Sequence, residues 1–481
     1  MKPASGLPAI GLIAVGVVAF ALAGRDVDSQ ISCYSIAATS AGLAGALLVS
    51  HRTGLRTALA SGRLGPWASL TFALVFGLSS LQWVDAQSDV GSGTLVAESV
   101  ADALALLTIA WGVWILGYNI GALQFLNRPA SWIVDIAIPP ESAEKEWRSS
   151  GVWVLLAFSL AGQALSTTTN SFGYLADASA SVASFSSFAQ MVNVLSNMGL
   201  FAVVVAAVNY FSPGRRGRLS TLVVVSATQV ALAVLQGTKE GIAIVAVAII
   251  LSYALVRGRV NARLLIASVV LFTFVVLPFV TTYRATVRVE GQQTSVATAI
   301  RVLPDVTQRT ASQSGYAESL DTMTDRLRNI DSLAIVMQRS PDVVPYEPTT
   351  DLATQSILGL VPRILWPNKP NFSQGYAFGQ TYYGTPTTLY SSFATTPPAD
   401  LYRHGGPFVL MIGMVLLGGV YRLFDDVLHP RTDFRHMFVI VAMFPVLVKH
   451  EVDVVALLLS VPLTLVGVAV AVRTLALVGK R

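Results

Sequence analysis

The sequence predicts an all-α polytopic membrane protein with about twelve transmembrane helices and one large extracytoplasmic loop. Three observations support this fold class. Hydrophobic residues make up 53% of the 481 residues and only 12% are charged, about half the share expected of a soluble chain. The mean hydropathy is +0.61, so the apolar surface exceeds what one core can bury. The apolar residues also occur in separate runs of helical length, which excludes a single water-soluble globule.

Each apolar run is expected to form one membrane helix, because about 17 to 25 apolar residues cross the hydrocarbon layer. In chain order the runs cover residues 7–24, 31–50, 68–84, 99–120, 151–169, 190–211, 219–236, 241–256, 264–282, 406–424, 437–449 and 454–474. The short run at 437–449 is tilted less than the others, extended by its flanks, or re-entrant. The chain therefore divides into helices one to nine (1–282), an extracytoplasmic loop domain (283–405) and helices ten to twelve (406–481).

The distribution of Lys and Arg over the short connections predicts the orientation. Nineteen basic residues fall in one set of alternate connections, and only Arg25, Lys239 and Lys449 fall in the other. Because basic residues are retained on the cytoplasmic side, both termini are expected in the cytoplasm and the 283–405 segment outside it. The net charge of +5 follows from this topology and is no argument for nucleic-acid binding.

Several function classes lack their sequence signatures. A P-loop, a His-Glu-x-x-His helix and a nucleophile elbow are all absent. The five histidines are scattered, and the single cysteine, Cys33, can form neither an intrachain disulfide nor a cysteine metal cluster. No internal repeat is evident, which argues against an inverted-repeat transporter. The sequence therefore predicts no metal site.

The 283–405 segment is the only long loop, and long ordered loops on a rigid scaffold are usually functional. It contains ten basic and ten acidic residues. Apolar residues at helical spacing predict helices over 316–339 and 352–365. Gly, Pro, Tyr, Ser and Thr dominate from 371 to 398, which predicts an irregular loop there.

Basic residues near the outer helix ends are candidate ligands for an anionic substrate. Arg284 and Arg288 follow the ninth run four residues apart, so they share one face if the helix continues, and two guanidiniums can bind phosphate oxygens. The alternative is that both snorkel to the lipid headgroups. Lys239 lies in a tight outward turn at 235–241, where it either binds phosphate or pairs with Glu240.

One stretch of the loop resembles a known family signature. Residues 360–370, Leu-Val-Pro-Arg-Ile-Leu-Trp-Pro-Asn-Lys-Pro, are similar to the Pro-Arg, aromatic, Pro-x-Lys-Pro signature of bacterial oligosaccharide repeat-unit polymerases, the Wzy-type O-antigen polymerase family. Residues 328–333 resemble the family's Arg and Asp before an amphipathic helix. The turn at 236–241 resembles its Gly-Ser-Arg-Gly turn with Lys in place of Arg, and 398–406 resembles the Glu-Leu-Tyr-x-Asn-Phe-Gly that opens the next span. The resemblance covers about 230–425.

This resemblance implies a C-type glycosyltransferase fold and a metal-independent enzyme without a cofactor. Such an enzyme polymerises undecaprenyl-diphosphate-linked oligosaccharide repeat units into surface polysaccharide at the outer face of the bacterial cytoplasmic membrane. The implied partners are the lipid-linked glycans, membrane lipids, and chain-length regulator and flippase proteins, with no nucleic acid. The residues that match the family motif are Arg328, Asp331, Pro362 and Pro367.

Cations are expected to hold the donor diphosphate, because a polyprenyl diphosphate leaving group departs with negative charge. The candidates are Lys239, Arg284, Arg288, Arg363, Lys369 and Arg403. Aromatic rings of the loop are expected to stack on sugar rings, the alternative being an aromatic belt at the membrane interface. These rings are Trp366, Tyr376, Tyr382, Tyr383, Tyr390 and Tyr402.

Asp400 and His404 are the candidate catalytic groups that activate the acceptor hydroxyl, because a carboxylate and an imidazole four residues apart share one face of a helix. The family shows Glu where Asp400 stands and Asn-Phe where His404 and Gly405 stand. The resemblance therefore favours Asp400 as the base or its essential partner and ranks His404 second. The alternative is structural: Asp400 caps the next helix or pairs with Arg403, and His404 is an interfacial residue.

Three other functions compete with polymerisation. An O-antigen or glycan ligase uses the same lipid-linked donor with a different acceptor, and the sequence leaves this alternative open. A lipid-linked-sugar flippase or other transporter requires buried charges along a path through the membrane and internal symmetry, whereas polar residues here concentrate in the loop. A membrane scaffold without catalysis would not need a loop of this length and composition.

Overall fold

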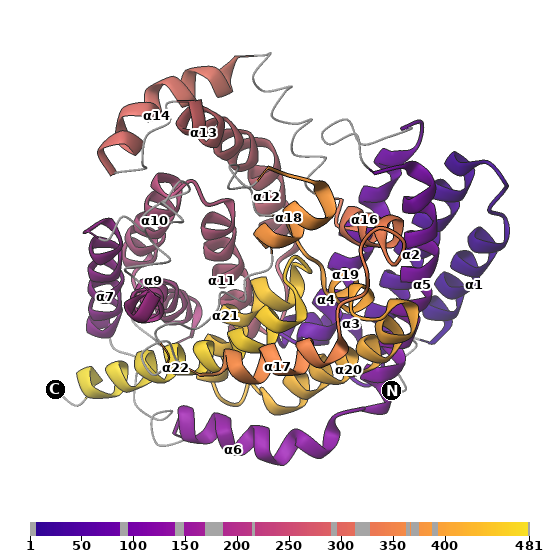
Figure 1. Cartoon of the computed structure of the whole chain (residues 1–481). Helices are drawn as coiled ribbons and strands as arrows, with labels where there is room; N and C mark the ends of the chain where they lie inside the picture. Colours follow the sequence, from indigo (N-terminus) through magenta and orange to yellow (C-terminus); the bar gives the residue numbers. More distant parts are fainter. Residues whose placement is uncertain are drawn as a thin grey trace.

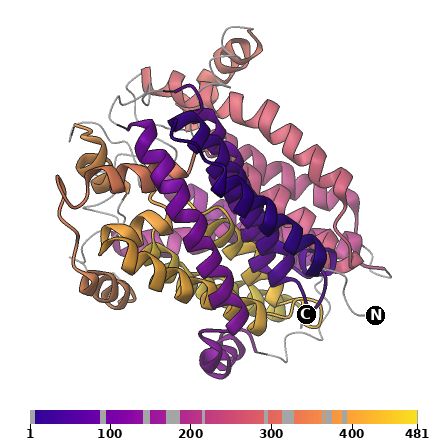
Figure 2. The ribbon, with the colours of Figure 1, turned by 90° about the vertical axis from the view of Figure 1, so that its right-hand side faces the viewer.

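Helices form the regular structure of the part of the chain that can be described, and they pack into one bundle (Figure 1). The computed structural model describes residues 6–86, 95–139, 149–168, 186–213, 217–289, 296–312, 328–361, 366, 375–386 and 393–479. Apolar runs favour helices because the backbone groups of a helix are paired within the segment, as a lipid environment requires. The two ends of the chain lie toward the same side of the bundle (Figure 2).

Nine helical stretches among the described residues are long and apolar enough to cross a membrane. Two of them are compound, because a π-helical turn interrupts each. The nine are α2 (Val27–Val49), α4–η1–η2 (Leu64–Phe72, Ala73–Gly77 and Leu78–Trp83), α5 (Ala97–Ile120), α7 (Ser149–Thr168), α9 (Ser186–Phe211), α11 (Lys239–Arg257), α12–η5–α13 (Ala262–Leu271, Phe272–Val276 and Leu277–Val289), α20 (Gly406–Val427) and α22 (Val454–Gly479).

Three shorter apolar helices coincide with the remaining predicted runs. They are α1 (Gly6–Ala21), α10 (Leu219–Leu235) and α21 (His436–Val448). The 13 residues of α21 extend over about 20 Å, less than the roughly 30 Å hydrocarbon layer. The all-α membrane fold class is therefore confirmed. In the described part of the chain, helices long enough for a full span cover nine of the twelve predicted runs.

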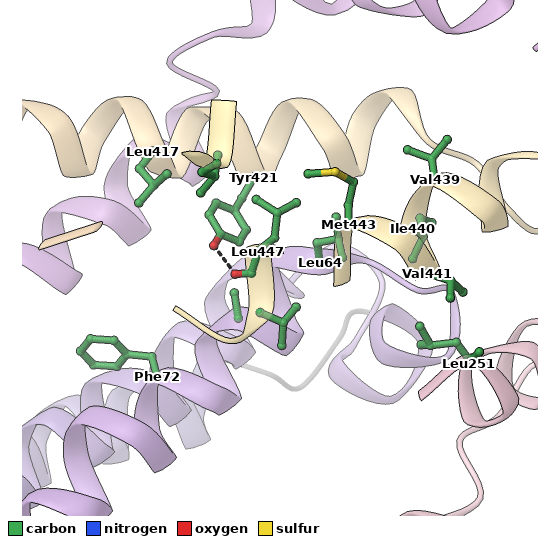
Figure 3. Close-up of a cluster of buried hydrophobic side chains, with 14 of the residues drawn as sticks. Leu64, Phe72, Leu251, Leu417, Tyr421, Val439, Ile440, Val441, Met443 and Leu447 are labelled. Atoms are coloured by element: carbon green, nitrogen blue, oxygen red, sulfur yellow. Dashed lines mark hydrogen bonds between the residues drawn. The ribbon is translucent and has the colours of Figure 1, made fainter. Parts of the chain in front are cut away.

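The short helix α21 lies among apolar side chains of α4, α11 and α20 (Figure 3). The last carbonyl groups of any helix lack an intrahelical partner. In α21, the Tyr421 hydroxyl of α20 donates to the Leu447 carbonyl, and Thr71 Oγ1 of α4 donates to the Val448 carbonyl at 2.6 Å. These contacts fix the end of α21 and the position of Lys449, which follows it.

Glycines allow α5 and α20 to approach closely. A Cβ atom at Gly117 would lie 2.2 Å from the Val415 carbonyl oxygen, and one at Gly418 would lie 2.2 Å from the Trp114 carbonyl oxygen. Small residues are typical of such membrane-helix contacts, because they let the two backbones approach. The position of α20 is thus tied to that of α5.

The described parts of the 283–405 segment form short helices. They are α14 (Val296–Ala311), α16 (Ile330–Arg339), α17 (Thr349–Gly359), α18 (Gly375–Tyr383) and α19 (Pro397–Arg403). Of these, α16, α18 and α19 contribute to the core of the bundle, whereas α14 packs on α13 in a separate cluster. Ile330, Leu333 and Tyr382 are fully buried in the same hydrophobic cluster as the long helices. The predicted boundary at residue 282 falls inside α13, which continues to Val289.

The structure corrects the helices predicted for this segment. α17 starts before the predicted residue 352 and ends at Gly359, and within the predicted 316–339 helix the described helical part begins at Ile330. α18 lies inside the stretch predicted as irregular. Its sequence has a weak helical signal, but Phe378 and Tyr382 are buried, so tertiary packing selects the helix.

Connections that are distant in the sequence contact one another at each of the two ends of the helices. At the loop end, defined by α16, α18 and α19, Trp83 Nε1 donates to Asp331 Oδ1 at 2.8 Å. At the basic end, defined by the connections after α11 and α20, Arg431 donates to the Gly258 carbonyl at 3.3 Å. The amphipathic helix α6 (Asn127–Ala137) follows α5 and lies across the bottom of the bundle in Figure 1.

Candidate functional site

A cavity of about 270 Å³ lies near the loop end, between α4–η1, α11, α12–η5–α13 and α21. The charged residues that line it are Lys239, Glu240, Arg284, Lys449 and Glu451. The apolar residues that line it include Ala243, Val247, Phe272, Val280, Phe444 and Val448. Apolar walls with a few converging charged groups suit a ligand that has one charged part and one apolar part.

Helix geometry places the charges at the mouth and the apolar residues deeper. Lys239 is the first residue of α11, and Ala243 and Val247 follow one and two turns later. The eight residues from Lys239 to Val247 correspond to about 12 Å of helix. Arg284 and Phe272 are twelve residues apart on α12–η5–α13, or about 18 Å. The cavity therefore extends from a charged mouth into the apolar part of the bundle.

Three of the helical stretches are irregular where they line this cavity. Val75 lies in the π-helical turn η1, Phe272 begins the π-helical turn η5, and Pro445 lies inside α21. π-helical turns occur frequently at functional sites, and irregular backbone at membrane depth is tolerated where it is buried or lines a cavity. The convergence of three irregularities makes this cavity the leading candidate site.

The structure brings two of the predicted cations, Lys239 and Arg284, to the mouth. Gly237, with a φ of 65°, forms the turn between α10 and α11, a conformation that favours glycine. Arg284 Nε donates to the Gly237 carbonyl at 2.8 Å, and the Tyr283 hydroxyl donates to the Leu235 carbonyl at 2.7 Å. The end of α13 thus holds the turn that carries Lys239.

Lys449 is a third cation at the mouth, and sequence reasoning did not select it. Its Nζ lies 2.9 Å from Glu240 Oε2 and 2.9 Å from Glu451 Oε2. Glu240, the alternative partner predicted for Lys239, therefore pairs with Lys449. Burial lowers the pKa of Lys449, but the two carboxylates outweigh it and raise the pKa above its ordinary value. The sequence contains a signal for Lys449, because it is one of only three basic residues in the short connections that are predicted to lie outside.

The predicted motif residues Arg328 and Asp331 lie close to this mouth. Arg328 Nε donates to Asp331 Oδ2 at 3.1 Å, and the Arg328 guanidinium lies 5.0 Å from the centre of the Trp83 ring. The intervening Asn329 is buried, and its side-chain amide donates to the Lys449 carbonyl at 3.3 Å. The motif segment therefore helps to fix Lys449.

A second polar cluster surrounds Asp400 on α19. Asp400 is fully buried; its Oδ1 accepts from Arg403 Nε at 2.8 Å, and its Oδ2 accepts from the Val454 N–H at 2.8 Å. Arg403 also pairs with Glu347 at 2.9 Å. Burial lowers the pKa of Arg403, but Asp400 and then Glu347 outweigh it and raise the pKa. The ion pair with Arg403 agrees with the structural alternative, whereas the helix start that Asp400 contacts is that of α22 and not that of the next helix, α20.

His404 and Glu347 lie next to each other in this cluster. His404 Nδ1 lies 2.7 Å from the Asp400 carbonyl oxygen, which can only accept, so Nδ1 carries a hydrogen. His404 Nε2 lies 3.3 Å from Glu347 Oε2. The two atoms are close enough for an ion pair but do not form a hydrogen bond, and His404 Nε2 has no hydrogen-bond partner among the described residues. The Glu347 side chain is 34% exposed, so a ligand can reach this pair, whereas Asp400 is enclosed.

The α21–α22 connection, residues 449–453, joins the cavity to this cluster. Lys449 and Glu451 line the cavity, whereas Asp453 interacts with Asp400 and accepts from the Ala456 N–H at 2.6 Å, which caps α22. Burial and then the Asp400 carboxylate raise the pKa of Asp453 to about 6. Five residues of extended chain reach at most about 18 Å, so one short connection serves both the cavity and the Asp400 cluster.

The rings predicted to stack on glycan differ in their accessibility. Tyr382 is fully buried, with its ring centre 4.9 Å from that of Phe378, so its faces belong to the core. Tyr402 is also buried. Tyr383 is half-buried and stacks on Phe393 with ring centres 4.4 Å apart. Burial therefore counts against Tyr382 and Tyr402 as sugar platforms.

The remaining predicted residues are placed only in part. Trp366 and Tyr376 are half-buried and stay candidates, and Arg288 lies in α13. Arg403 belongs to the Asp400 cluster rather than to the lining of the cavity. In the described ranges, no group of three or more His, Cys, Asp or Glu side chains is placed to hold a metal ion. The predicted residues that lie outside the described residues are Pro362, Arg363, Pro367, Lys369 and Tyr390.

Comparison with family models gives a match to a domain of unknown function (DUF8712) over residues 163–426, more than half of the chain. Neither curated proteins nor solved structures give a match. The matched segment contains Lys239, Arg284 and Asp400, whereas Lys449 and Asp453 follow it. From the extent of this match, the protein is a member of the DUF8712 family.

Proposed function

We propose that the protein polymerises undecaprenyl-diphosphate-linked oligosaccharide repeat units into surface polysaccharide, such as O-antigen, capsule or exopolysaccharide. The observation that carries the proposal is the cavity, in which Lys239, Arg284 and Lys449 lie at the mouth of apolar walls. A polyprenyl diphosphate matches this arrangement, because it has an anionic diphosphate head on an apolar isoprenoid chain. The resemblance of residues 230–425 to repeat-unit polymerases supplies the reaction class.

Activation of the donor is electrostatic in this proposal. The acceptor hydroxyl oxygen attacks the anomeric carbon, the bond from that carbon to the diphosphate oxygen breaks, and the diphosphate leaves with the electron pair. Lys239 and Arg284 stabilise this charge more as it develops than in the bound donor, which is the requirement for catalysis. The N-terminus of α11 adds its positive dipole end. Thr238, its N-cap residue, makes no side-chain cap there.

Activation of the acceptor requires a group that takes the hydroxyl proton as the new bond forms. We assign this role to the Glu347–His404 pair, because a carboxylate and an imidazole lie 3.3 Å apart there and Glu347 is accessible. Asp400 then acts as a positioning residue, which holds His404 through its backbone carbonyl and Arg403 through its carboxylate. This assignment keeps Asp400 as the essential partner of the predicted site and adds Glu347.

The proposal places the loop end at the outer face of the bacterial cytoplasmic membrane, with twelve spans and both termini in the cytoplasm. The three shorter apolar helices would complete these spans with neighbouring residues. The grouping of the Arg431 and Gly258 connections at the basic end supports this orientation, because both connections belong to the set rich in Lys and Arg. The lipid-linked donor and acceptor would reach the cavity from the outer leaflet.

Reconstitution tests the proposal directly. Purified full-length protein in liposomes would be supplied with one defined lipid-linked repeat unit, and the products would be separated by length. A ladder of two or more repeats on the lipid carrier is expected, and Lys239→Met should reduce it at equal protein level. Products of one repeat only, from folded wild-type protein, would refute polymerisation.

The same donor cavity would serve a glycan ligase, and a deletion strain separates these two functions. Loss of a polymerase leaves single-repeat glycans on the cell surface, whereas loss of a ligase leaves no glycan attached. We expect the single-repeat pattern. Restoration of the ladder by the wild-type chain, but not by Lys239→Met, would connect the pattern to the cavity.

A further inference from the structure

Two carboxylates form ion pairs with Lys449 at the mouth of the cavity. Lys449 Nζ lies 2.9 Å from one oxygen of Glu240 and 2.9 Å from one oxygen of Glu451, and all three side chains line the cavity. These carboxylate oxygens are the same kind of hard anionic acceptor as phosphate oxygens. The Lys449 ammonium is thus held as it would be by a diphosphate.

We infer that Glu240 and Glu451 take the place of the donor's phosphate oxygens on Lys449 in the unloaded protein and compete with a polyprenyl diphosphate for this cation. The inference rests on the proposed function of the cavity and extends it to the control of affinity. Lys449 becomes a third ligand of the diphosphate, beside Lys239 and Arg284. Glu240 and Glu451 become an internal competitor that sets how tightly the donor binds.

The surroundings of Lys449 allow such an exchange of partners. Its backbone is fixed, because Asn329 donates to the Lys449 carbonyl and Thr71 donates to the preceding Val448 carbonyl. The Glu240 side chain is 51% exposed, so its carboxylate can turn into water when an anion replaces it. The ammonium therefore changes partner without a movement of α21.

An internal competitor has a use in a transfer reaction. After the glycan has been transferred, the isoprenoid diphosphate product carries one more negative charge than the donor did and would remain bound to three cations. Carboxylates that return to Lys449 weaken this product complex, and product release limits the turnover of many enzymes. They also keep the half-buried ammonium paired between turnovers, which avoids the cost of an uncompensated charge.

Binding to the full-length protein in detergent tests the inference, with geranylgeranyl diphosphate as the probe and geranylgeraniol as its uncharged counterpart. Glu240→Gln and Glu451→Gln should each tighten diphosphate binding about three- to tenfold, because each removes a competing charge-assisted contact. Lys449→Met should weaken it about tenfold. The matched control is Glu98→Gln, which makes the same charge change at an exposed residue in the first turn of α5.

The signs of these effects separate competition from a structural role. If either glutamate variant weakens binding, or tightens it no more than Glu98→Gln does, the inference is overturned. If Glu451→Gln fails to fold, Glu240→Gln decides alone, since its side chain is half exposed. Failure of wild-type protein to bind the diphosphate more tightly than geranylgeraniol would instead refute the proposed donor cavity.

Discussion

At the scale of residues, the functional candidates are fixed by partners that are distant in the sequence. Arg284 bonds to the turn at Gly237, 47 positions away. Lys449 pairs with Glu240 across 209 positions. Each pairing joins two helix ends at one place, so substitutions at these residues test both binding and the geometry of the mouth.

Arg284→Ala should lower polymer synthesis about ten- to a hundredfold, because a charge-assisted hydrogen bond contributes roughly 1.5 to 3 kcal/mol. Arg284→Lys should also lower it, since an ammonium lacks the fork that can bond to the Gly237 carbonyl and still face an anion. The measurement is turnover in liposomes at equal protein level. Arg309→Ala, at an exposed arginine of α14, is the control. Wild-type turnover in Arg284→Ala would remove Arg284 from the donor site.

Asp400→Asn and Glu347→Gln should separate positioning from proton transfer. Asp400→Asn removes the charge of a fully buried partner of Arg403, so it should cost about 3 kcal/mol of stability and lower the melting temperature. Glu347→Gln alters a more accessible partner of Arg403, so turnover should fall at unchanged donor affinity, with a smaller loss of melting temperature than in Asp400→Asn. A normal pH profile of turnover in Glu347→Gln would contradict the role of Glu347 in taking the hydroxyl proton.

Asp453 should make stability dependent on pH. Its pKa of about 6 in the folded protein lies above the ordinary value of 3.8, so the protonated form stabilises the fold below about pH 4, and this contribution is lost as the pH rises through about 6. In Asp453→Asn the side chain does not ionise, so the stability of this variant does not fall for this reason as the pH rises. Its stability relative to wild type should therefore increase by up to about 3 kcal/mol between pH 4 and 7. A difference in melting temperature that stays constant over this range would contradict the burial of an ionisable Asp453.

At the scale of elements, the contact between α5 and α20 offers a matched pair of substitutions within one helix. Gly117→Ala would place a Cβ atom 2.2 Å from the Val415 carbonyl oxygen, whereas a Cβ at Gly112 meets nothing within 4 Å. Gly117→Ala should destabilise the protein by about 2 kcal/mol or more, because α20 must move. Gly112→Ala should be neutral or slightly stabilising, since alanine favours helix. Equal melting temperatures for both variants would contradict this helix contact.

The long helices could be predicted from the sequence, and the irregular ones could not. A run such as 99–120 carries its own signal, because apolar length alone selects a helix in lipid, and α5 covers it. α18 has no such signal, since burial of Phe378 and Tyr382 by distant segments stabilises it. The π-helical turns at η1 and η5 also have no local pattern, because they depend on how neighbouring helices pack.

At the scale of the whole molecule, part of the candidate site could be predicted from the sequence. Lys239 and Arg284 were predicted together, because both follow from the orientation of the spans and from their places at helix ends. Lys449 and Glu347 were not selected, because their partners, Glu240 and His404, lie in other segments and no spacing rule connects them. Tertiary structure decides such pairs, whereas a sequence shows only the neighbours along the chain.

Orientation is the prediction on which the proposed reaction as a whole depends. Reporters fused after residues 215 and 260 should be cytoplasmic, and a reporter fused after residue 350 should be outside. The reason is that one set of alternate short connections holds nineteen basic residues and the other set holds three. The measurement uses two reporters, one active only in the cytoplasm and one active only outside it. A fusion after residue 430 should report the same side as the fusion after residue 260, since Arg431 contacts Gly258. Glu347 bonds to Arg403 beside the Asp400 cluster, so residue 350 reports the side on which the acceptor would bind. A cytoplasmic signal at residue 350 would place the cluster on the wrong side for outer-face polymerisation.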